Sequence, residues 1–121
     1  MKKRILLVDD EASIRDLLAQ ALTKKGYEVS SAGSGFEAKR MARENIPDLL
    51  ISDLQMEDTD GFTLIDELKR SLPDMPVLLL TGVLFDPETI AEVVNKKISG
   101  YVNKTESLQK ILAEIHRLCP V

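Results

Sequence analysis

Apolar runs of strand length alternate along the chain with segments whose apolar residues recur every three or four positions. The strand-like runs cover residues 5–8, 27–32, 49–52, 77–80 and 98–102. Five such runs separated by helical spacing predict βαβ units around a parallel sheet. Because most of the runs are aliphatic throughout, we expect helices to cover both faces of that sheet.

The helix-like segments have recognisable starts and stops. Gly26 ends the first segment, and Pro47 prevents the second from continuing into the third strand. Capping or turn residues open the later segments, namely Ser34 with Glu37, Gly61, Asp86-Pro87 and Thr105. The first segment carries its expected buried stripe at Ile14, Leu17, Leu18, Ala21 and Leu22.

The composition fits one ordinary folded domain, which we expect to span residues 1–121. The chain is 44% hydrophobic and 30% charged, which is too apolar for a disordered segment. Its 16 basic and 20 acidic residues leave a net charge of −4, which argues against nucleic-acid binding. With a single cysteine, Cys119, no disulfide can form within the chain, and no apolar stretch is long enough to span a membrane. A cytoplasmic location is the default expectation.

Polar side chains stand at the carboxyl ends of the predicted strands. Asp9-Asp10 follows the first strand, Asp53 the third, Thr81 the fourth and Lys104 the fifth. Open parallel sheets bind ligands beyond these ends, so the five residues are expected at one edge. Three carboxylates so close together cannot all stay ionised unaided, and a bound cation is the simplest remedy.

This set of residues suits phosphoryl transfer. One carboxylate can attack, while a lysine and a hydroxyl meet the transferred oxygens. Hard oxygen ligands favour Mg²⁺, with Mn²⁺ as a substitute. The chain has no glycine-rich nucleotide loop, and its one histidine, His116, falls in the last helix, away from the strand ends.

These residues also carry a family resemblance. The motifs Val8-Asp9-Asp10-Glu11, Asp53-Leu54-Gln55-Met56 with Asp60-Gly61, Leu80-Thr81-Gly82, and Tyr101-Val102-Asn103-Lys104 resemble the receiver domain of two-component response regulators, of the chemotaxis-regulator type. The resemblance spans essentially the whole chain. It implies a flavodoxin-like, doubly wound (βα)5 three-layer α/β sandwich with parallel sheet order 2-1-3-4-5.

The resemblance also implies roles for individual residues. Asp53 would be the phosphoacceptor and a metal ligand, with Asp10 binding Mg²⁺ directly and Asp9 through water. Gln55 would contribute its backbone carbonyl, Gly82 its backbone amide, and Lys104 and Thr81 their side chains to the phosphoryl group. Tyr101 would move inward with Thr81 as the switch.

The resemblance further implies that the chain is a signalling domain that assists its own phosphorylation and dephosphorylation. The phosphoryl group would come from a phosphohistidine on a sensor kinase or a histidine phosphotransfer protein. Added charge would then change a docking surface around the fourth helix, fifth strand and fifth helix, for an output partner or a second copy of the chain. No contact with nucleic acid or membrane is expected.

Three departures from the family pattern stand out. Thr105 occupies the position after the lysine where the family usually has a proline, whose cis peptide positions that loop. Glu57 replaces another usual proline, and Lys97-Ile98 replaces a common Gly-Ala pair. In addition, Val83-Leu84-Phe85 is unusually apolar, and either forms an exposed contact patch or packs against the fourth helix.

Two other functions stay open on the sequence alone. A haloacid-dehalogenase-like phosphatase also forms an aspartyl phosphate at a strand end with Mg²⁺, but its usual second Asp is replaced here by Gln55. A degenerate receiver acting as a constitutive interaction module would be favoured by the Thr105 and Lys97 departures, whereas the intact acids count against it.

Overall fold

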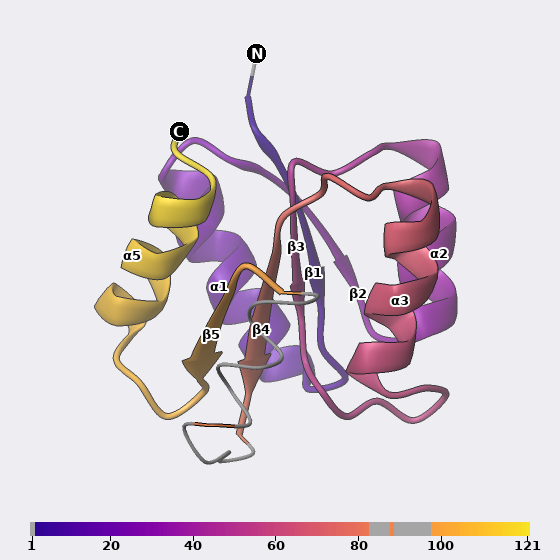
Figure 1. Cartoon of the computed structure of the whole chain (residues 1–121). Coiled ribbons are helices and arrows are strands. Elements are labelled where there is room, and N and C mark those ends of the chain that lie inside the picture. The colour runs from indigo at the N-terminus through magenta and orange to yellow at the C-terminus, as the bar shows by residue number, and fades with distance from the viewer. Residues whose placement is uncertain (1, 83–87, 89–97) are drawn as a thin grey trace.

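The computed structural model describes residues 2–82, 88 and 98–121, and Figure 1 shows its arrangement. Within these residues a parallel sheet has the strand order β2-β1-β3-β4-β5. The expected fold class and strand order are confirmed. The strands are β1 (Arg4–Val8), β2 (Glu28–Ala32), β3 (Leu49–Ser52), β4 (Val77–Thr81) and β5 (Gly100–Asn103), and the helices are α1 (Ala12–Lys24), α2 (Gly35–Glu44), α3 (Gly61–Ser71) and α5 (Leu108–Leu118).

Helices cover both faces of the sheet, with α1 and α5 on one side and α2 and α3 on the other (Figure 1). Alternate residues of a strand point to opposite faces, so β1 supplies both layers. Ile5 and Leu7 pack in the layer that contains Leu18 and Leu22 of α1, while Leu6 and Val8 pack in the layer of α2 and α3. Burial on both sides explains why residues 5–8 of β1 are apolar at every position.

The strand boundaries differ slightly from those expected. The second strand begins at Glu28 and not at Tyr27. Tyr27 instead turns into the layer beside α5, where its hydroxyl donates to the carbonyl oxygen of Cys119 at 2.6 Å. The last strand covers Gly100–Asn103, later than the expected 98–102. Ile98 is buried all the same, packed in the layer of α2 and α3.

Helix capping confirms one expectation and corrects another. Ser34 caps α2 as predicted, because its Oγ accepts a hydrogen bond from the Glu37 amide. The prediction that Thr105 caps the last helix is wrong. Ser107 caps α5 by accepting from the Lys110 amide, since the Thr105 hydroxyl is already bound to the side chain of Asn103.

The apolar stripe expected on α1 is partly exposed. Leu18 and Leu22 are buried, whereas Leu17 is 55% exposed. Helical spacing identifies the side of α1 that faces the sheet but not where that side ends. Gly26 follows the helix with φ of +103°, a left-handed conformation that glycine adopts without strain.

Some expectations fall outside the described residues. These are the fourth helix with its Asp86-Pro87 start, the Val83-Leu84-Phe85 segment and the Lys97 position. None of the helices that the structure describes is long and apolar enough to cross a bilayer.

Candidate functional site

The strand register brings the predicted site residues to one edge of the sheet. Val8 of β1 pairs with Ser52 of β3, so the next residues, Asp9 and Asp53, leave the sheet side by side. The Asp53 amide also donates to the Val8 carbonyl at 2.9 Å. On the other side of β3, Thr81 at the end of β4 pairs with Asn103 at the end of β5. Lys104 follows directly.

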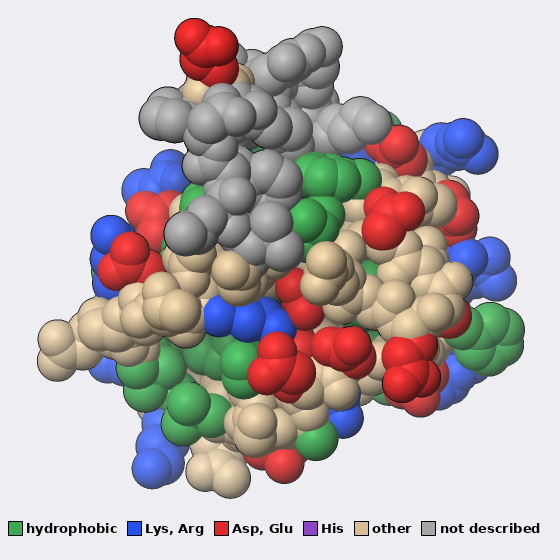
Figure 2. Space-filling model, turned by 90° about the horizontal axis from the view of Figure 1, so that it is seen from below, with side chains coloured by type: hydrophobic (Ala, Val, Ile, Leu, Met, Phe, Trp, Pro, Cys, Tyr) green, Lys and Arg blue, Asp and Glu red, His purple; other side chains and the backbone are tan. Residues whose placement is uncertain are grey.

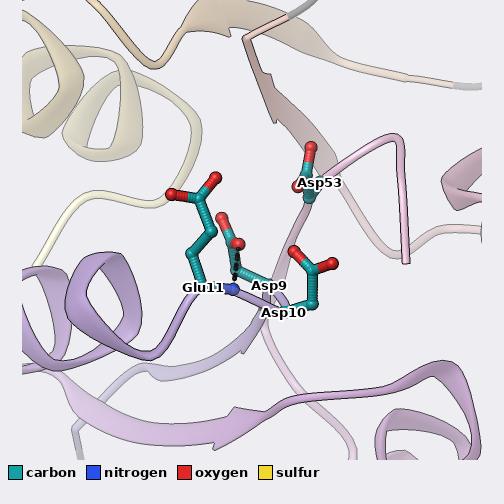
Figure 3. Close-up of side chains that lie close together, drawn as sticks. All are labelled: Asp9, Asp10, Glu11 and Asp53. Carbon is teal, nitrogen blue, oxygen red and sulfur yellow. Dashed lines mark hydrogen bonds between the residues drawn. The ribbon is translucent and has the colours of Figure 1, made fainter. Parts of the chain in front are cut away.

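Four carboxylates converge at this edge, as Figure 3 shows. Oxygens of Asp9, Asp10, Glu11 and Asp53 all lie within 4.8 Å of one another. Asp9 and Asp53 are 1% and 6% exposed, while Asp10 and Glu11 are exposed to solvent. Part of the cluster is therefore held in the protein interior and part faces solvent, from which a ligand can approach.

Lys104 partly neutralises this cluster. Its Nζ lies 2.8 Å from Asp9 Oδ2 and 2.9 Å from both Glu11 Oε1 and Asp53 Oδ2. In Figure 2, acidic side chains gather around a basic one near the middle of the face at the carboxyl ends of the strands. One ammonium against four carboxylates leaves the cluster short of positive charge.

The pKa values reflect this environment. Burial disfavours the charge on Lys104, but its contacts with Asp9, Asp53 and Glu11 outweigh burial and raise its pKa, so the ammonium persists at neutral pH. Burial also raises the pKa of Asp9, and Lys104 and the Glu11 amide offset that rise in part. Keeping Asp9 ionised in the folded protein therefore opposes folding.

The donor set fits a divalent cation. Asp9 Oδ2 is buried and accepts no hydrogen bond of regular geometry within the part of the chain described here, despite the nearby Lys104 Nζ. Asp9 Oδ1, in contrast, accepts from the Glu11 amide at 2.9 Å. Four carboxylates that share a single ammonium provide the hard oxygen ligands that Mg²⁺ prefers. The acidic cluster expected for the metal is therefore present.

The loop between β3 and α3 is held close to Asp53. Asp53 Oδ1 accepts from the Leu54 amide at 2.7 Å, and the Leu54 carbonyl accepts from the Gly61 amide at 2.6 Å. Gln55 and Asp60 form an isolated bridge across the loop. A Cβ on Gly61 would lie 2.3 Å from the Asp53 carbonyl oxygen, so this close approach needs glycine.

Two acidic residues act in ways that the sequence did not indicate. Glu11 stands at the N-cap of α1, but its side chain makes no capping bond and reaches Lys104 instead. Asp58 accepts from the Gly35 and Phe36 amides, at 2.9 Å each. These bonds lower the pKa of Asp58 and join the β3–α3 loop to the start of α2. No local motif marks a cap that comes from 22 residues away.

The remaining predicted residues lie at or near the same edge. Thr81 is 1% exposed at the end of β4, and its carbonyl accepts from the Lys104 amide at 3.0 Å. Gly82 follows Thr81 and is exposed, as is Gln55. Tyr101 is partly buried against the layer of α2 and α3. The described peptide bonds contain no cis bond, and this holds for the one between Lys104 and Thr105.

A hollow of about 500 Å³ lies away from the acidic cluster, between α1 and α5 beside Tyr27, and no Asp or Glu side chain lines it. A smaller hollow of about 110 Å³ adjoins Lys104 and is lined mainly by apolar residues such as Ile14, Leu18 and Leu108. Charge and side-chain chemistry, not cavity size, therefore identify the site.

Comparison with known proteins gives a consistent result. A family model described as the response regulator receiver domain matches residues 5–116. The chain is 34% identical over 115 residues to the response regulator MprA of Mycobacterium leprae, and 41% identical over 87 residues to the transcriptional regulatory protein GlrR of Escherichia coli. These matches cover 95% and 72% of this chain but 50% and 20% of the relatives, so the chain spans half or less of their length.

Solved structures agree. The chemotaxis protein CheY4 of Vibrio cholerae matches with a TM-score of 0.89 and 29% identity, over 98% of this chain and 99% of that one. The non-phosphorylated HemR receiver domain of Leptospira biflexa matches with a TM-score of 0.90 and 28% identity, over 99% and 96% of the two chains.

Replacing Gly61 should destabilise the fold through the contact at Asp53. We expect Gly61→Ala to lower the free energy of unfolding by about 2 kcal/mol, because the added methyl group has no room beside the Asp53 carbonyl. Urea unfolding followed by circular dichroism measures this. Gly82→Ala is the matched control, since a Cβ there meets nothing within 4 Å. Equal stability of the two variants would contradict the close approach.

Removing one buried charge should stabilise the protein. We expect Asp9→Asn to raise the free energy of unfolding at pH 7, without Mg²⁺, by about 1 kcal/mol. The substitution removes a buried negative charge, while Lys104 retains its ion pairs with Asp53 and Glu11. The gain should shrink as the pH falls. A carboxyl with a raised pKa is protonated in the folded protein first, so protonation stabilises the unmodified protein in the same way.

The exposed helical residue Asp16 provides the control for this comparison. Asp16→Asn should change the free energy of unfolding by less than about 0.5 kcal/mol at either pH. If Asp9→Asn proves less stable than the unmodified protein at pH 7, charge crowding at the strand ends is not the dominant effect.

Proposed function

This chain belongs to the receiver-domain family of two-component response regulators, and we propose that it accepts a phosphoryl group on Asp53 from a phosphohistidine of a partner protein. The observation that supports this most is the position of Asp53, whose carboxylate lies among three other acids and 2.9 Å from the Lys104 ammonium. We also propose that residues 1–121 form a single receiver domain.

In the proposed reaction Asp53 is the nucleophile. An oxygen of its carboxylate forms a bond to phosphorus as the bond from phosphorus to the imidazole nitrogen of the donor breaks. The released imidazole keeps the bonding electron pair and takes up a proton from solvent. Asp53 Oδ1 is held by the Leu54 amide, which orients the carboxylate, while Oδ2 faces Lys104.

Asp10, Asp53 and the Gln55 carbonyl are the proposed direct ligands of Mg²⁺, with Asp9 acting through water. When bound, the cation would supply positive charge between the acids and the phosphoryl oxygens. The proximity of the four carboxylates and the exposure of Asp10 to solvent support this assignment.

Lys104 has a second proposed role. Its ammonium already contacts Asp53, and after transfer it would donate to a phosphoryl oxygen at that position. The Thr81 hydroxyl and the Gly82 amide are the further proposed donors. Their place at the end of β4, adjacent to β3 in the sheet, supports both assignments.

The proposed output is a changed protein surface. The acyl phosphate carries up to two negative charges in place of the one on the Asp53 carboxylate. Thr81 and Lys104 would contact its oxygens, with Tyr101 moving inward as the threonine does. We propose that the affected face lies around β5 and α5, that it contacts an output domain, a target protein or a second copy of the chain, and that the protein acts in the cytoplasm. A sensor histidine kinase or a histidine phosphotransfer protein would provide the input.

Substitution of the nucleophile tests the proposal. Asp53→Asn should abolish labelling by acetyl phosphate in the presence of Mg²⁺, because an amide cannot attack phosphorus under these conditions. A phosphate-affinity gel measures the labelled fraction. Asp16→Asn, which changes one charge on the exposed side of α1, should label as the unmodified protein does.

Three further outcomes test the proposal and its alternatives. Excess EDTA should stop labelling of the unmodified protein, and labelling that survives in Asp53→Asn would show that Asp53 is not the acceptor. Rapid turnover of a generic phosphate ester would instead favour the phosphatase function.

A further inference from the structure

The turn between β5 and α5 contains a set of hydrogen bonds that no part of the phosphoacceptor site explains. Asn103, the last residue of β5, is 8% exposed. Its Oδ1 accepts from the Thr105 amide at 2.9 Å and from the Thr105 hydroxyl at 2.8 Å. The Asn103 carbonyl also accepts from the Glu106 amide at 3.0 Å. The side chain of Asn103 therefore closes a turn around Lys104.

Lys104 is the residue enclosed by this turn. Its own amide donates to the Thr81 carbonyl at 3.0 Å, which joins it to β4. The next residue, Thr105, is held by the Asn103 side chain. The backbone of Lys104 is thus constrained by its bond to β4 and by the turn that encloses it. Its side chain, in contrast, is a flexible four-carbon stem that must place the ammonium among Asp9, Glu11 and Asp53.

The turn is specific to the residue types found here. Thr105 supplies both an amide hydrogen and a hydroxyl, and proline, the usual family residue at this position, has neither. Thr105 does not cap α5, because Ser107 does so. Thr105 is exposed, yet its hydroxyl, the one hydrogen-bond donor of its side chain, donates to the side-chain oxygen of the buried Asn103.

We propose that Asn103 and Thr105 are positioning residues for Lys104. Their hydrogen bonds set the direction in which the Lys104 side chain leaves the backbone, and this brings Nζ to Asp53. Neither residue touches the reacting atoms. The consequence for phosphoryl transfer rests on the proposed function, but the effect on Lys104 itself does not, since the ammonium lies at Asp53 without any phosphoryl group.

The first experiment observes Lys104 directly in the unphosphorylated protein. Its ammonium group should give a slowly exchanging ¹H–¹⁵N signal because three carboxylates hold it, and loss of that signal in Lys104→Met provides the assignment. In Asn103→Ala the signal should shift and broaden toward those of exposed lysines. Thr105→Val, which keeps the amide but removes the hydroxyl, should show a smaller change, and Thr105→Ser should restore the original signal.

The second experiment follows phosphorylation by acetyl phosphate. The rate constant at saturating donor should fall about tenfold in Asn103→Ala and about threefold in Thr105→Val, because a misplaced ammonium no longer meets the phosphoryl oxygens. The half-saturating donor concentration and the Mg²⁺ affinity measured by calorimetry should not change. Thr105→Ser should react as the unmodified protein does.

Ser107→Ala serves as the control for simple loss of local stability. It removes the α5 cap four residues beyond Asn103 without touching the turn. It should lower the unfolding midpoint yet leave the Lys104 signal and the rate constant unchanged. Thr105 is exposed, so Thr105→Val should fold even if Asn103→Ala does not.

An unchanged Lys104 signal in folded Thr105→Val and Asn103→Ala would overturn the proposal, as would an equal change in Ser107→Ala. Failure of the proposed function has a different signature. In that case the unmodified protein is not labelled at all, while the ammonium signals still report whether the turn positions Lys104.

Discussion

The Lys104 ammonium, within 2.9 Å of three carboxylates, is the interaction on which the site depends. Without it, the buried Asp9 and Asp53 would face each other and Asp10 with no neutralising charge from the described chain. Burial of like charges opposes folding, so one lysine makes the acidic edge tolerable. One positive charge cannot balance four carboxylates, and this remaining negative charge explains why the edge suits a divalent cation.

The parallel sheet determines how this charge arrangement can exist. Asp9 and Asp53 come from strands that are 41 residues or more apart in sequence yet adjacent in the sheet, through the pairing of Val8 with Ser52. Thr81 and Lys104 come from the other side of β3. Loop contacts then refine the position of each side chain. Gly61 brings the β3–α3 loop against Asp53, Asp58 joins that loop to α2, and Asn103 closes the turn at Lys104.

Much of the fold and of the site could be predicted from local pattern. Aliphatic runs predicted β1, β3 and β4 closely, the run 27–32 predicted β2 to within one residue, and helical spacing with capping residues predicted α1, α2 and α3. Thr105 as a helix cap was wrong because a capping residue type says nothing about competing partners, and here Asn103 holds it. The contact of Glu11 with Lys104 could not be predicted from local pattern, since the two residues are 93 positions apart.

By itself, the sequence determined the parallel α/β architecture and the residue types at the strand ends, because hydrophobic period and strand-end chemistry are local properties. The resemblance of its motifs then indicated the family that the comparisons established. The tertiary structure decided which charges meet. Burial of Asp9, the three ion pairs of Lys104 and the reach of Asp58 to α2 all depend on distances between segments remote in sequence, and only packing sets those distances.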